Sequence, residues 1–227
     1  MLRTTTPTPA GVTPPRRGIE DFAAADPGNR KQMRELRKIW LPYWRETTTR
    51  DGGKPEKRRK IYRRLKNRVA HAQKTPRTGF YALYSEGRVA GFAFFGLSGG
   101  IKSIGIPPEY GIVMEFCVAP AFRRRGFATE MNRQMEEVFL GWGITDVFLT
   151  PDPVTGVPFW RAAGYTDSQL RDPDTKRAVY VKRLCPLPCL DALSKEQLDT
   201  EMEIGWREHL TGKGIPADEV FAEFQGA

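Results

Sequence analysis

Residues 114–129 carry the residue types that could bind a phosphorylated ligand. Three consecutive arginines over 123–125 are followed directly by Gly126, and the small residue Ala128 lies two residues further on. Guanidinium groups are bidentate donors to phosphate oxygens, and glycine lets a backbone come close to a bulky anion. The pattern therefore predicts a binding site for a diphosphate.

The elements around this segment would position it for that task. Residues 112–118 are expected to form a strand that Pro120 stops, and an amphipathic helix is expected from Gly126 to about Leu140. The first amides of a helix have no internal partners, and the helix dipole adds partial positive charge. A diphosphate would therefore meet backbone N–H groups as well as arginine side chains.

The rest of the chain predicts an α+β domain. Two helices are expected first, one capped by Asp26 and one beginning near Glu56, with a loop over residues 47–55 between them. An aromatic-rich hairpin over 79–95 follows. After Leu140 we expect a strand over 146–150, a short helix over 157–163 and a last strand over 178–182. This order is typical of helices packed on a mainly antiparallel sheet.

Composition narrows the class of protein. The 227 residues carry a formal net charge of +9, which favours polyanionic partners. No stretch is long and apolar enough to span a membrane, and the N-terminus lacks the apolar core of a secretory signal. Three cysteines and two histidines support neither a disulfide scaffold nor a structural metal site. We expect a cytoplasmic protein that needs no metal.

The composition also changes along the chain. Residues 1–17 are rich in Thr and Pro and are predicted to be a disordered arm. Residues 18–184 are expected to form the folded domain. Residues 185–227 are acidic and predict a helical C-terminal extension.

Two motifs resemble those of the GNAT (GCN5-related N-acetyltransferase) superfamily. Arg123, Gly126 and Ala128 occupy the three defining positions of its motif A, a Gln or Arg, two variable residues, Gly, one variable residue, then Gly or Ala. Residues 157–165 (VPFWRAAGY) are similar to the family's "F-Y-x-x-x-G-F" ending. The resemblance covers roughly residues 18–184, and the first strand is its weakest part because only residues 18–22 are available for it.

The resemblance implies a GNAT fold, acetyl-CoA as cosubstrate, and direct transfer to an amine in a ternary complex without a metal. The thioester would lie between the strand ending at Val118 and the strand at Phe148, which the family splays apart. The backbone groups of Phe116, Cys117 and Val118 would pair with the pantetheine arm, and Phe159 would wall the thiol end. The residues expected to hold the cosubstrate are Phe116, Cys117, Val118, Arg123, Arg124, Arg125, Gly126, Phe127, Ala128, Thr129 and Phe159.

The sequence departs from the family pattern at two positions. Trp160 stands where the family often has a Tyr that is proposed to protonate the departing thiolate. Asp152-Pro153 replaces the Asn usually found near the start of that helix. An indole is no acid at neutral pH, so the acid role is open to another residue, to water, or to unassisted departure of the thiolate.

Glu115 is the candidate base. Strand alternation places it on the same face as Cys117, where a carboxylate could accept or orient the proton of an acceptor amine. The alternative is that Glu115 only pairs with a nearby arginine. Cys117 as an acyl-carrying nucleophile is disfavoured, because the family transfers directly and no His is near it in sequence.

Both ends of the domain carry unbalanced charge. The two expected N-terminal helices are basic, which suggests an acidic acceptor (a small molecule, a protein or tRNA) or else only a solvated face. Residues 214–224 (GIPADEVFAEF) are similar to the C-terminal segment of RelB-type antitoxins, where that segment wraps a basic partner. The acidic tail could thus dock on the chain's own basic helices or on another basic protein.

Edge strands of the GNAT fold often pair between two chains, so a homodimer is also considered.

Three functional hypotheses remain at this point. The first is an N-acetyltransferase acting on an amine acceptor. The second is a GNAT-fold binding or regulatory protein with little catalysis, favoured by Trp160 and Asp152. The third is a toxin–antitoxin-related module that acts on aminoacyl-tRNA, favoured by the basic helices and the tail.

Overall fold

The computed structural model describes residues 21–50, 52–184 and four tail positions, 195, 199, 203 and 206. The chain divides into two units after Leu184. The four tail positions are helical and exposed. The predicted N-terminal arm, the remainder of the tail and the antitoxin-like segment lie outside the described residues.

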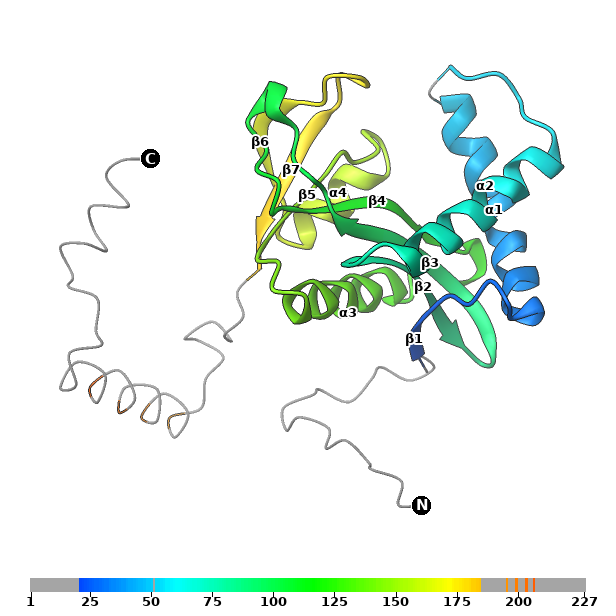
Figure 1. Cartoon of the computed structure of the whole chain (residues 1–227), viewed down its shortest axis with the longest axis horizontal. Coiled ribbons are helices and arrows are strands. Elements are labelled where there is room, and N and C mark those ends of the chain that lie inside the picture. Colours follow the sequence, from blue (N-terminus) through cyan, green and yellow to red (C-terminus); the bar gives the residue numbers. More distant parts are fainter. Residues whose placement is uncertain are drawn as a thin grey trace. The chain divides into compact units, whose positions relative to one another are not determined.

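The first unit is built on a mixed, mainly antiparallel sheet (Figure 1). Its seven described strands are arranged in the order β1-β2-β3-β4-β5-β7-β6. All neighbouring strands pair antiparallel except β4 and β5, which are parallel. The strands are β1 (Asp21–Ala24), β2 (Thr78–Ser85), β3 (Arg88–Leu97), β4 (Gly111–Val118), β5 (Asp146–Leu149), β6 (Thr166–Arg171) and β7 (Ala178–Arg183).

Four described α-helices flank this sheet. They are α1 (Arg30–Arg50), α2 (Arg58–Lys74), α3 (Phe127–Gly141) and α4 (Gly156–Ala162). Two short 3-10 turns, η1 (Lys102–Ile104) and η2 (Pro120–Phe122), lie before and after β4. Helix α3 is the crossover between the parallel pair β4 and β5, which a two-residue turn could not join.

Aromatic side chains divide the sheet into two packed faces. On the α1–α2 face, Trp40 is fully buried, its indole Nε1 donates to the Ile61 carbonyl at 3.1 Å, and its ring contacts Phe80 and Phe92. On the α3 face, Phe95 contacts Phe139 with ring centroids 5.0 Å apart. Successive residues of a strand point to opposite faces, so β3 supplies aromatic side chains to both layers.

The first helix differs from prediction at both ends. Its cap is Asn29, whose Oδ1 accepts from the Gln32 amide at 3.0 Å, whereas Asp26 accepts from Gly28 in the preceding turn. The loop expected from residue 47 begins later, because α1 continues to Arg50. The Thr47 hydroxyl donates to the carbonyl oxygens of the turn before it, at 3.1 and 3.2 Å. These bonds give the hydroxyl partners within the helix, although such bonding slightly destabilises a helix.

Two strands differ from what the sequence predicted. The first strand, sought over residues 18–22, is observed at Asp21–Ala24 and pairs with β2. Strand β6 was not predicted at all, because its sequence TDSQLR has no apolar alternation and its residues are exposed or half-buried. Pairing with β7 makes it a strand, which is a tertiary effect. The helices and the other strands lie where the periodicity predicted them.

No helix in the described part of the chain is long and apolar enough to cross a bilayer.

Candidate functional site: the arginine turn and the carboxylate cluster

A bulge in β4 determines which side chains reach which face. Phe94 pairs with Glu115, but the next residue of β3, Phe95, pairs with Val113, so Met114 is an extra residue. Register partners share a face. Val113 therefore lies with Phe95 on the α3 face, and Glu115 lies with Phe94 on the α1–α2 face. Without the bulge, two-residue alternation would place Val113 and Glu115 on the same face.

The same bulge marks the point where the sheet opens. Strand β4 pairs with β5 only over Gly111–Val113, opposite Val147–Leu149. Residues 114–118 of β4 continue beside β3 but have no register partner in β5. The two parallel strands therefore separate at Met114, as was expected for the strands ending at Val118 and containing Phe148.

Backbone groups of β4 point into this opening at alternate residues. The Ala119 amide donates to the Ala90 carbonyl at 2.8 Å, which fixes the alternation of the antiparallel ladder with β3. By that alternation, Glu115 and Cys117 direct their backbone groups to β3, whereas Phe116 and Val118 direct theirs to the side from which β5 has separated. Phe116, Cys117 and Val118 were expected to pair with a pantetheine arm. Of these three, Cys117 has its backbone groups directed to β3, away from the opening.

The segment after β4 forms a tight turn, Arg123–Gly126, that we name the arginine turn. Arg124 has φ 61° and Gly126 has φ 84°, so two residues of this turn adopt left-handed conformations. A non-glycine residue in that region is uncommon and costs about 1 kcal/mol or more. Backbone strain of this kind is concentrated at functional sites.

The arginine turn leads directly into an uncapped helix. Gly126 is the N-cap of α3, and no side chain caps the helix there. The first intrahelical bond runs from the Glu130 amide to the Gly126 carbonyl at 3.1 Å. The amides of Phe127, Ala128 and Thr129 therefore have no helical acceptor and, with the helix dipole, form a place for an anion.

The three arginines of the turn do not act alike. Arg123 turns back to β4, and its Nε donates to the Val118 carbonyl at 3.0 Å. Arg125 lies over the rings of Phe122 and Phe127, at 5.7 and 5.4 Å. The Arg124 side chain is exposed. The backbone amides are thus the fixed donors here, and the arginines mainly add positive potential around them.

The sequence profile described as "Acetyltransferase (GNAT) family" matches residues 33–165, more than half of the chain. This chain belongs to the GNAT acetyltransferase family. No curated protein matches it in a sequence search.

Solved structures support the same fold for this GNAT protein. PaiA N-acetyltransferase from Thermoplasma acidophilum, in complex with coenzyme A, aligns with a TM-score of 0.54 at 16% identity, covering 73% of this chain and 98% of that one. An acetyltransferase from Thermus thermophilus gives 0.53 at 15%, covering 72% and 96%. Aminoglycoside 6'-acetyltransferase type Ii gives 0.54 at 14%, covering 74% and 100%. At these identities the likeness concerns the fold.

The described residues of this GNAT protein fit coenzyme A by chemistry. An uncapped helix N-terminus surrounded by arginines suits its diphosphate. The backbone groups of Phe116 and Val118 that face away from β3 suit an amide-containing arm, although the Val118 carbonyl also accepts from Arg123. Aromatic rings also pack around Phe116 of β4. Phe116 stacks on Phe159 of α4 with centroids 5.5 Å apart and meets Trp160 edge-on at 4.9 Å.

Trp160, the GNAT position that departs from the family pattern, is part of this aromatic wall. It is buried and also packs edge-on against Tyr165, with centroids 5.0 Å apart. Burial and the neighbouring Glu136 raise the pKa of the Tyr165 phenol well above its ordinary value, so it is no better suited as an acid. Trp160 therefore takes a packing role.

Glu115 lies at the centre of a polar group that we name the carboxylate cluster. The Tyr43 hydroxyl of α1 donates to its Oε2, and Arg68 of α2 donates to its Oε1 from Nε at 3.0 Å and NH2 at 2.9 Å. Three elements thus converge on one buried carboxylate. The pairing with an arginine, which the sequence offered as the alternative to a catalytic role, is thus observed with Arg68.

Burial and charge oppose each other at Glu115. Burial raises the pKa of the Glu115 carboxyl above its ordinary value, while the Arg68 charge and the hydrogen bonds from Tyr43 and Arg68 lower it. Arg68 is itself positioned by aromatic rings, and its guanidinium lies 5.0 Å from Trp44 and 5.5 Å from Trp40. Burial and Glu115 raise the pKa of Tyr43 well above its ordinary value. A carboxylate with a raised pKa is a stronger base than an exposed one.

Cys117 is buried beside this cluster. Burial raises the pKa of its thiol to about 12, although Arg123 lowers it. A thiol of that pKa contributes almost no thiolate near neutral pH, and the thiolate is the nucleophilic form. The chemistry of Cys117 agrees with the sequence argument against an acyl-enzyme.

Asp152, found where the family usually has Asn, organises the loop after β5. Its Oδ1 accepts from the Thr155 amide at 2.7 Å and hydroxyl at 2.8 Å, which closes the turn before α4. Its Oδ2 accepts from Arg50 at the end of α1. Burial acts to raise the pKa of Asp152, but these hydrogen bonds and the Arg50 charge lower it to about 2.

Tyr43 and Arg68 were not predicted as site residues. In the sequence, Tyr43 has the spacing of a core aromatic on the apolar side of α1. Arg68 is one of many cations in α2. A usable signal exists for Arg68, because it lies seven residues after Ile61 and three after Leu65, on the buried side of α2. A cation on a buried helix face requires an anionic partner. The sequence does not show which carboxylate that partner is.

Proposed function

We propose that this protein transfers the acetyl group of acetyl-CoA to an amine of an acceptor, directly, within a ternary complex. The observation that carries the proposal is the separation of β4 from β5 at Met114, next to the uncapped N-terminus of α3. The free edge of β4 beyond Met114 suits the pantetheine arm of coenzyme A. The anion site at the start of α3 suits its diphosphate. The family assignment supports the same reaction.

The residues of the chain have distinct tasks in this proposal. The amides of Phe127, Ala128 and Thr129 hold the diphosphate, with Arg123, Arg124, Arg125 and Gly126 around it. Phe116 and Val118 bind the arm through their backbone, with Cys117 buried behind them and Phe159 at the thiol end. Acetyl-CoA supplies the activated acyl group, and no metal is needed for its transfer.

Glu115 is the proposed base. In the transfer, the acceptor nitrogen bonds to the acetyl carbon, the carbon–sulfur bond breaks, and one proton leaves the nitrogen. Glu115 takes that proton, directly or through water, because it is the buried carboxylate of the segment that borders the opening. Arg68 and Tyr43 hold its two oxygens and set its basicity. An aliphatic thiol has a pKa of about 8.5, so its thiolate can leave without a dedicated acid.

The acceptor is proposed to be an amine on an acidic molecule in the cytoplasm, because α1 and α2 present many cations. A small molecule, a protein and tRNA all satisfy that description. A screen that follows release of free thiol from acetyl-CoA, over a panel of acceptors of each type, would distinguish them.

The proposal is tested by binding of acetyl-CoA to the wild type and to Gly126→Glu. The substitution places a negative side chain at a left-handed glycine beside the proposed diphosphate site. At a hundredfold excess over Kd, binding should stabilise the wild type by roughly 2.7 kcal/mol, a rise in Tm of about 2–4 °C per kcal/mol. We expect Gly126→Glu to lose that rise and the calorimetric signal.

A matched control is available at the other end of α3. Gly143 is also left-handed, with φ 74°, and no atom lies within 4 Å of a Cβ built there. Gly143→Glu therefore imposes similar backbone strain and the same charge without touching the arginine turn. It should bind acetyl-CoA as the wild type does. Failure of the wild type to bind would refute the proposal, and equal loss in both variants would show that strain is the cause.

A further inference from the structure

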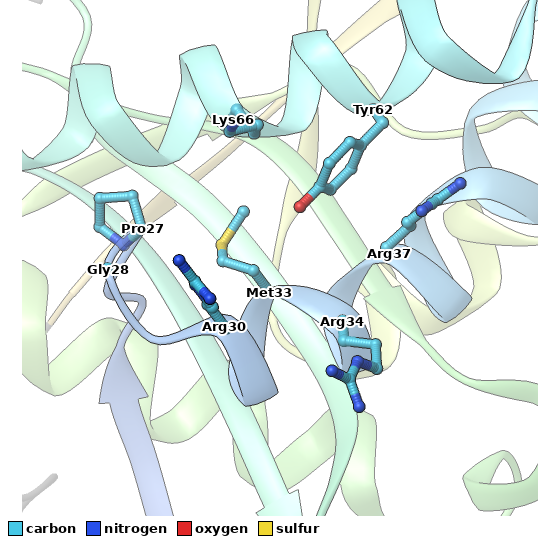
Figure 2. A pocket seen from close by; sticks show the side chains of 8 residues that line it. All are labelled: Pro27, Gly28, Arg30, Met33, Arg34, Arg37, Tyr62 and Lys66. Carbon is cyan, nitrogen blue, oxygen red and sulfur yellow. The ribbon is translucent and has the colours of Figure 1, made fainter.

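A basic groove follows α2 and over part of its length lies between α2 and α1, apart from the acetyl-transfer site. It consists of two adjoining hollows of about 500 and about 620 Å³ that share Tyr62 and Lys66. The first is lined by cations of both helices, and Tyr62 projects from α2 into it with its hydroxyl directed toward Met33 (Figure 2). Besides Lys57 and Lys60, six cations line the groove: Arg30, Arg34, Arg37, Arg59, Arg63 and Lys66.

Helical geometry separates the basic groove from the carboxylate cluster. Arg30, Arg34 and Arg37 are spaced by four and three residues, so they share one side of α1. At 3.6 residues per turn, Tyr43 leaves α1 roughly on the other side. The same spacing argument separates Lys66 from Arg68 in α2. The groove is therefore a second cationic surface rather than part of the transfer site.

Within the described part of the chain, these six cations have no carboxylate partner. No Asp or Glu lines either hollow, and among the described residues none of the six is in an ion pair. Of the nearby glutamates, Glu35 pairs with Lys38. Glu56 pairs with Arg64 and with Lys60, a further cation of the second hollow. Like charges four residues apart, such as Arg30 and Arg34, destabilise a helix by a few tenths of a kcal/mol per pair. The sequence tolerates this repulsion in both helices.

The shape and lining of the groove distinguish between anionic ligands. It is open to solvent, and each helix contributes a row of cations about 10 Å long. Duplex nucleic acid carries one charge per about 1.7 Å, so this length meets several phosphates. An acidic protein would need buried apolar or aromatic anchors. The groove offers chiefly Tyr62, and the charges of Arg37 and Lys66 already lie over its ring, at 4.9 and 5.8 Å.

We infer that the basic groove binds the phosphodiester backbone of nucleic acid without reading its sequence. Guanidinium and ammonium groups contact phosphates, which carry no base identity. Because cations flank Tyr62, its ring is unsuited to stacking on a base. Binding should therefore depend steeply on salt and little on sequence. The inference does not rest on the proposed acetyl transfer and is tested without acetyl-CoA.

The test is fluorescence anisotropy with a labelled RNA hairpin and a DNA duplex of the same stem sequence, over a range of salt concentrations. Arg34→Glu/Lys66→Glu reverses one cation on each side of the groove. Each phosphate contact adds about 0.9 to the slope of log K against log salt. We expect the double variant to lower that slope by about 1.8, with at least about a tenfold weaker affinity at low salt.

Matched variants keep the test decisive. Arg88→Glu/Lys102→Glu changes the net charge by the same amount at exposed positions outside the groove, and it should keep the wild-type slope. Arg34→Gln/Lys66→Gln repeats the test without charge reversal if the first variant fails to fold, as judged by circular dichroism. A loss of equal size in the Arg88/Lys102 variant would overturn the inference, as would no RNA binding by the wild type at low salt.

Two other polyanions serve as competitors. Polyglutamate stands for an acidic protein, and vesicles containing phosphatidylserine stand for an anionic membrane. The inference predicts that each displaces labelled RNA less effectively than unlabelled RNA does at equal charge concentration. Displacement by either one that equals or exceeds that by RNA, and is lost in the groove variant, would show instead that the groove serves that class of partner.

Discussion

The arginine turn and the carboxylate cluster are both built on β4, but they are assembled in different ways. The turn uses consecutive residues, and its fixed donors are backbone amides at the start of α3. The cluster joins three side chains, and Tyr43 and Arg68 are 72 and 47 residues away from Glu115 in sequence. One is a local structure and the other exists only in the folded domain.

This difference suggests a division of labour between the two regions. Backbone amides cannot be changed by evolution without changing the fold, so they suit a cosubstrate that stays the same. Side chains from separate helices can be exchanged one at a time, so they suit an acceptor that differs between proteins. Changes at the turn should therefore alter cosubstrate binding, and changes at the cluster should alter turnover.

The largest expected effect at the cluster is that of Glu115→Gln. The amide keeps the shape of the side chain but cannot accept the proton of an amine. We expect kcat to fall by about 10²- to 10⁴-fold, the usual contribution of a general base. The Kd for acetyl-CoA, measured by calorimetry, should not change. This result would be the opposite of that expected for Gly126→Glu.

Glu86→Gln, at an exposed turn, is the control for loss of one carboxylate. In the wild type, activity should also decline toward acid pH, with a midpoint above the ordinary glutamate pKa of about 4.3, because burial raises the pKa of Glu115. Full activity of Glu115→Gln would leave the cluster with a structural role only.

A smaller effect is expected from Arg68→Gln, which removes the cation that lowers the pKa of Glu115. That pKa should rise further, so the acid limb of the activity profile should move to higher pH. The raised pKa of Glu115 also makes the free energy of unfolding depend on pH. A folded carboxyl with a raised pKa binds its proton more tightly than the unfolded chain does. The free energy of unfolding therefore falls as pH rises through the folded pKa, and more steeply in the variant.

Arg64→Gln is a close control for this change. Arg64 also lies over the Trp44 ring, at 5.0 Å, but it pairs with Glu56. Its loss should leave the acid limb in place. Urea unfolding at several pH values, together with pH–rate profiles, measures both effects. An unchanged limb in Arg68→Gln would mean that the two side chains are not coupled in solution.

The smallest effect concerns two turns of the same sequence pattern. Asp152 and Asp172 each begin a D-P-x-T turn, and each accepts from the Thr amide and hydroxyl three residues later. Only Asp152 also accepts from Arg50. Asp152→Asn should keep the turn and lose the pair, whereas Asp152→Ala should lose both and cost about 1 kcal/mol.

Low pH separates the two contributions further. The pKa of Asp152 is lowered to about 2, so its stabilising effect is complete above the ordinary value and is lost as pH falls toward about 2. Asp172→Asn, without an Arg50, should be closer to neutral in urea unfolding. Equal effects at the two positions would show that Arg50 contributes nothing measurable.

Sequence patterns predicted most of the fold because most elements show a clear period. Ile61, Leu65 and Val69 mark the buried side of α2, and all three are fully buried. Where the period is absent, prediction failed, as in β6. Local competition also misled it, since Asp26 and Asn29 are both good caps and only the folded geometry selects Asn29.

The sequence by itself determined the arginine turn, because its residues adjoin in the chain and the start of a helix dictates where the amides of Phe127, Ala128 and Thr129 point. It also determined that the side chains of Glu115 and Cys117 lie on the same face of their strand. The tertiary structure alone decided that Met114 forms a bulge, that β5 leaves β4 there, and that Tyr43 and Arg68 meet Glu115. The physical reason is that periodicity and caps act over a few residues, whereas register and burial depend on which distant segments pack together.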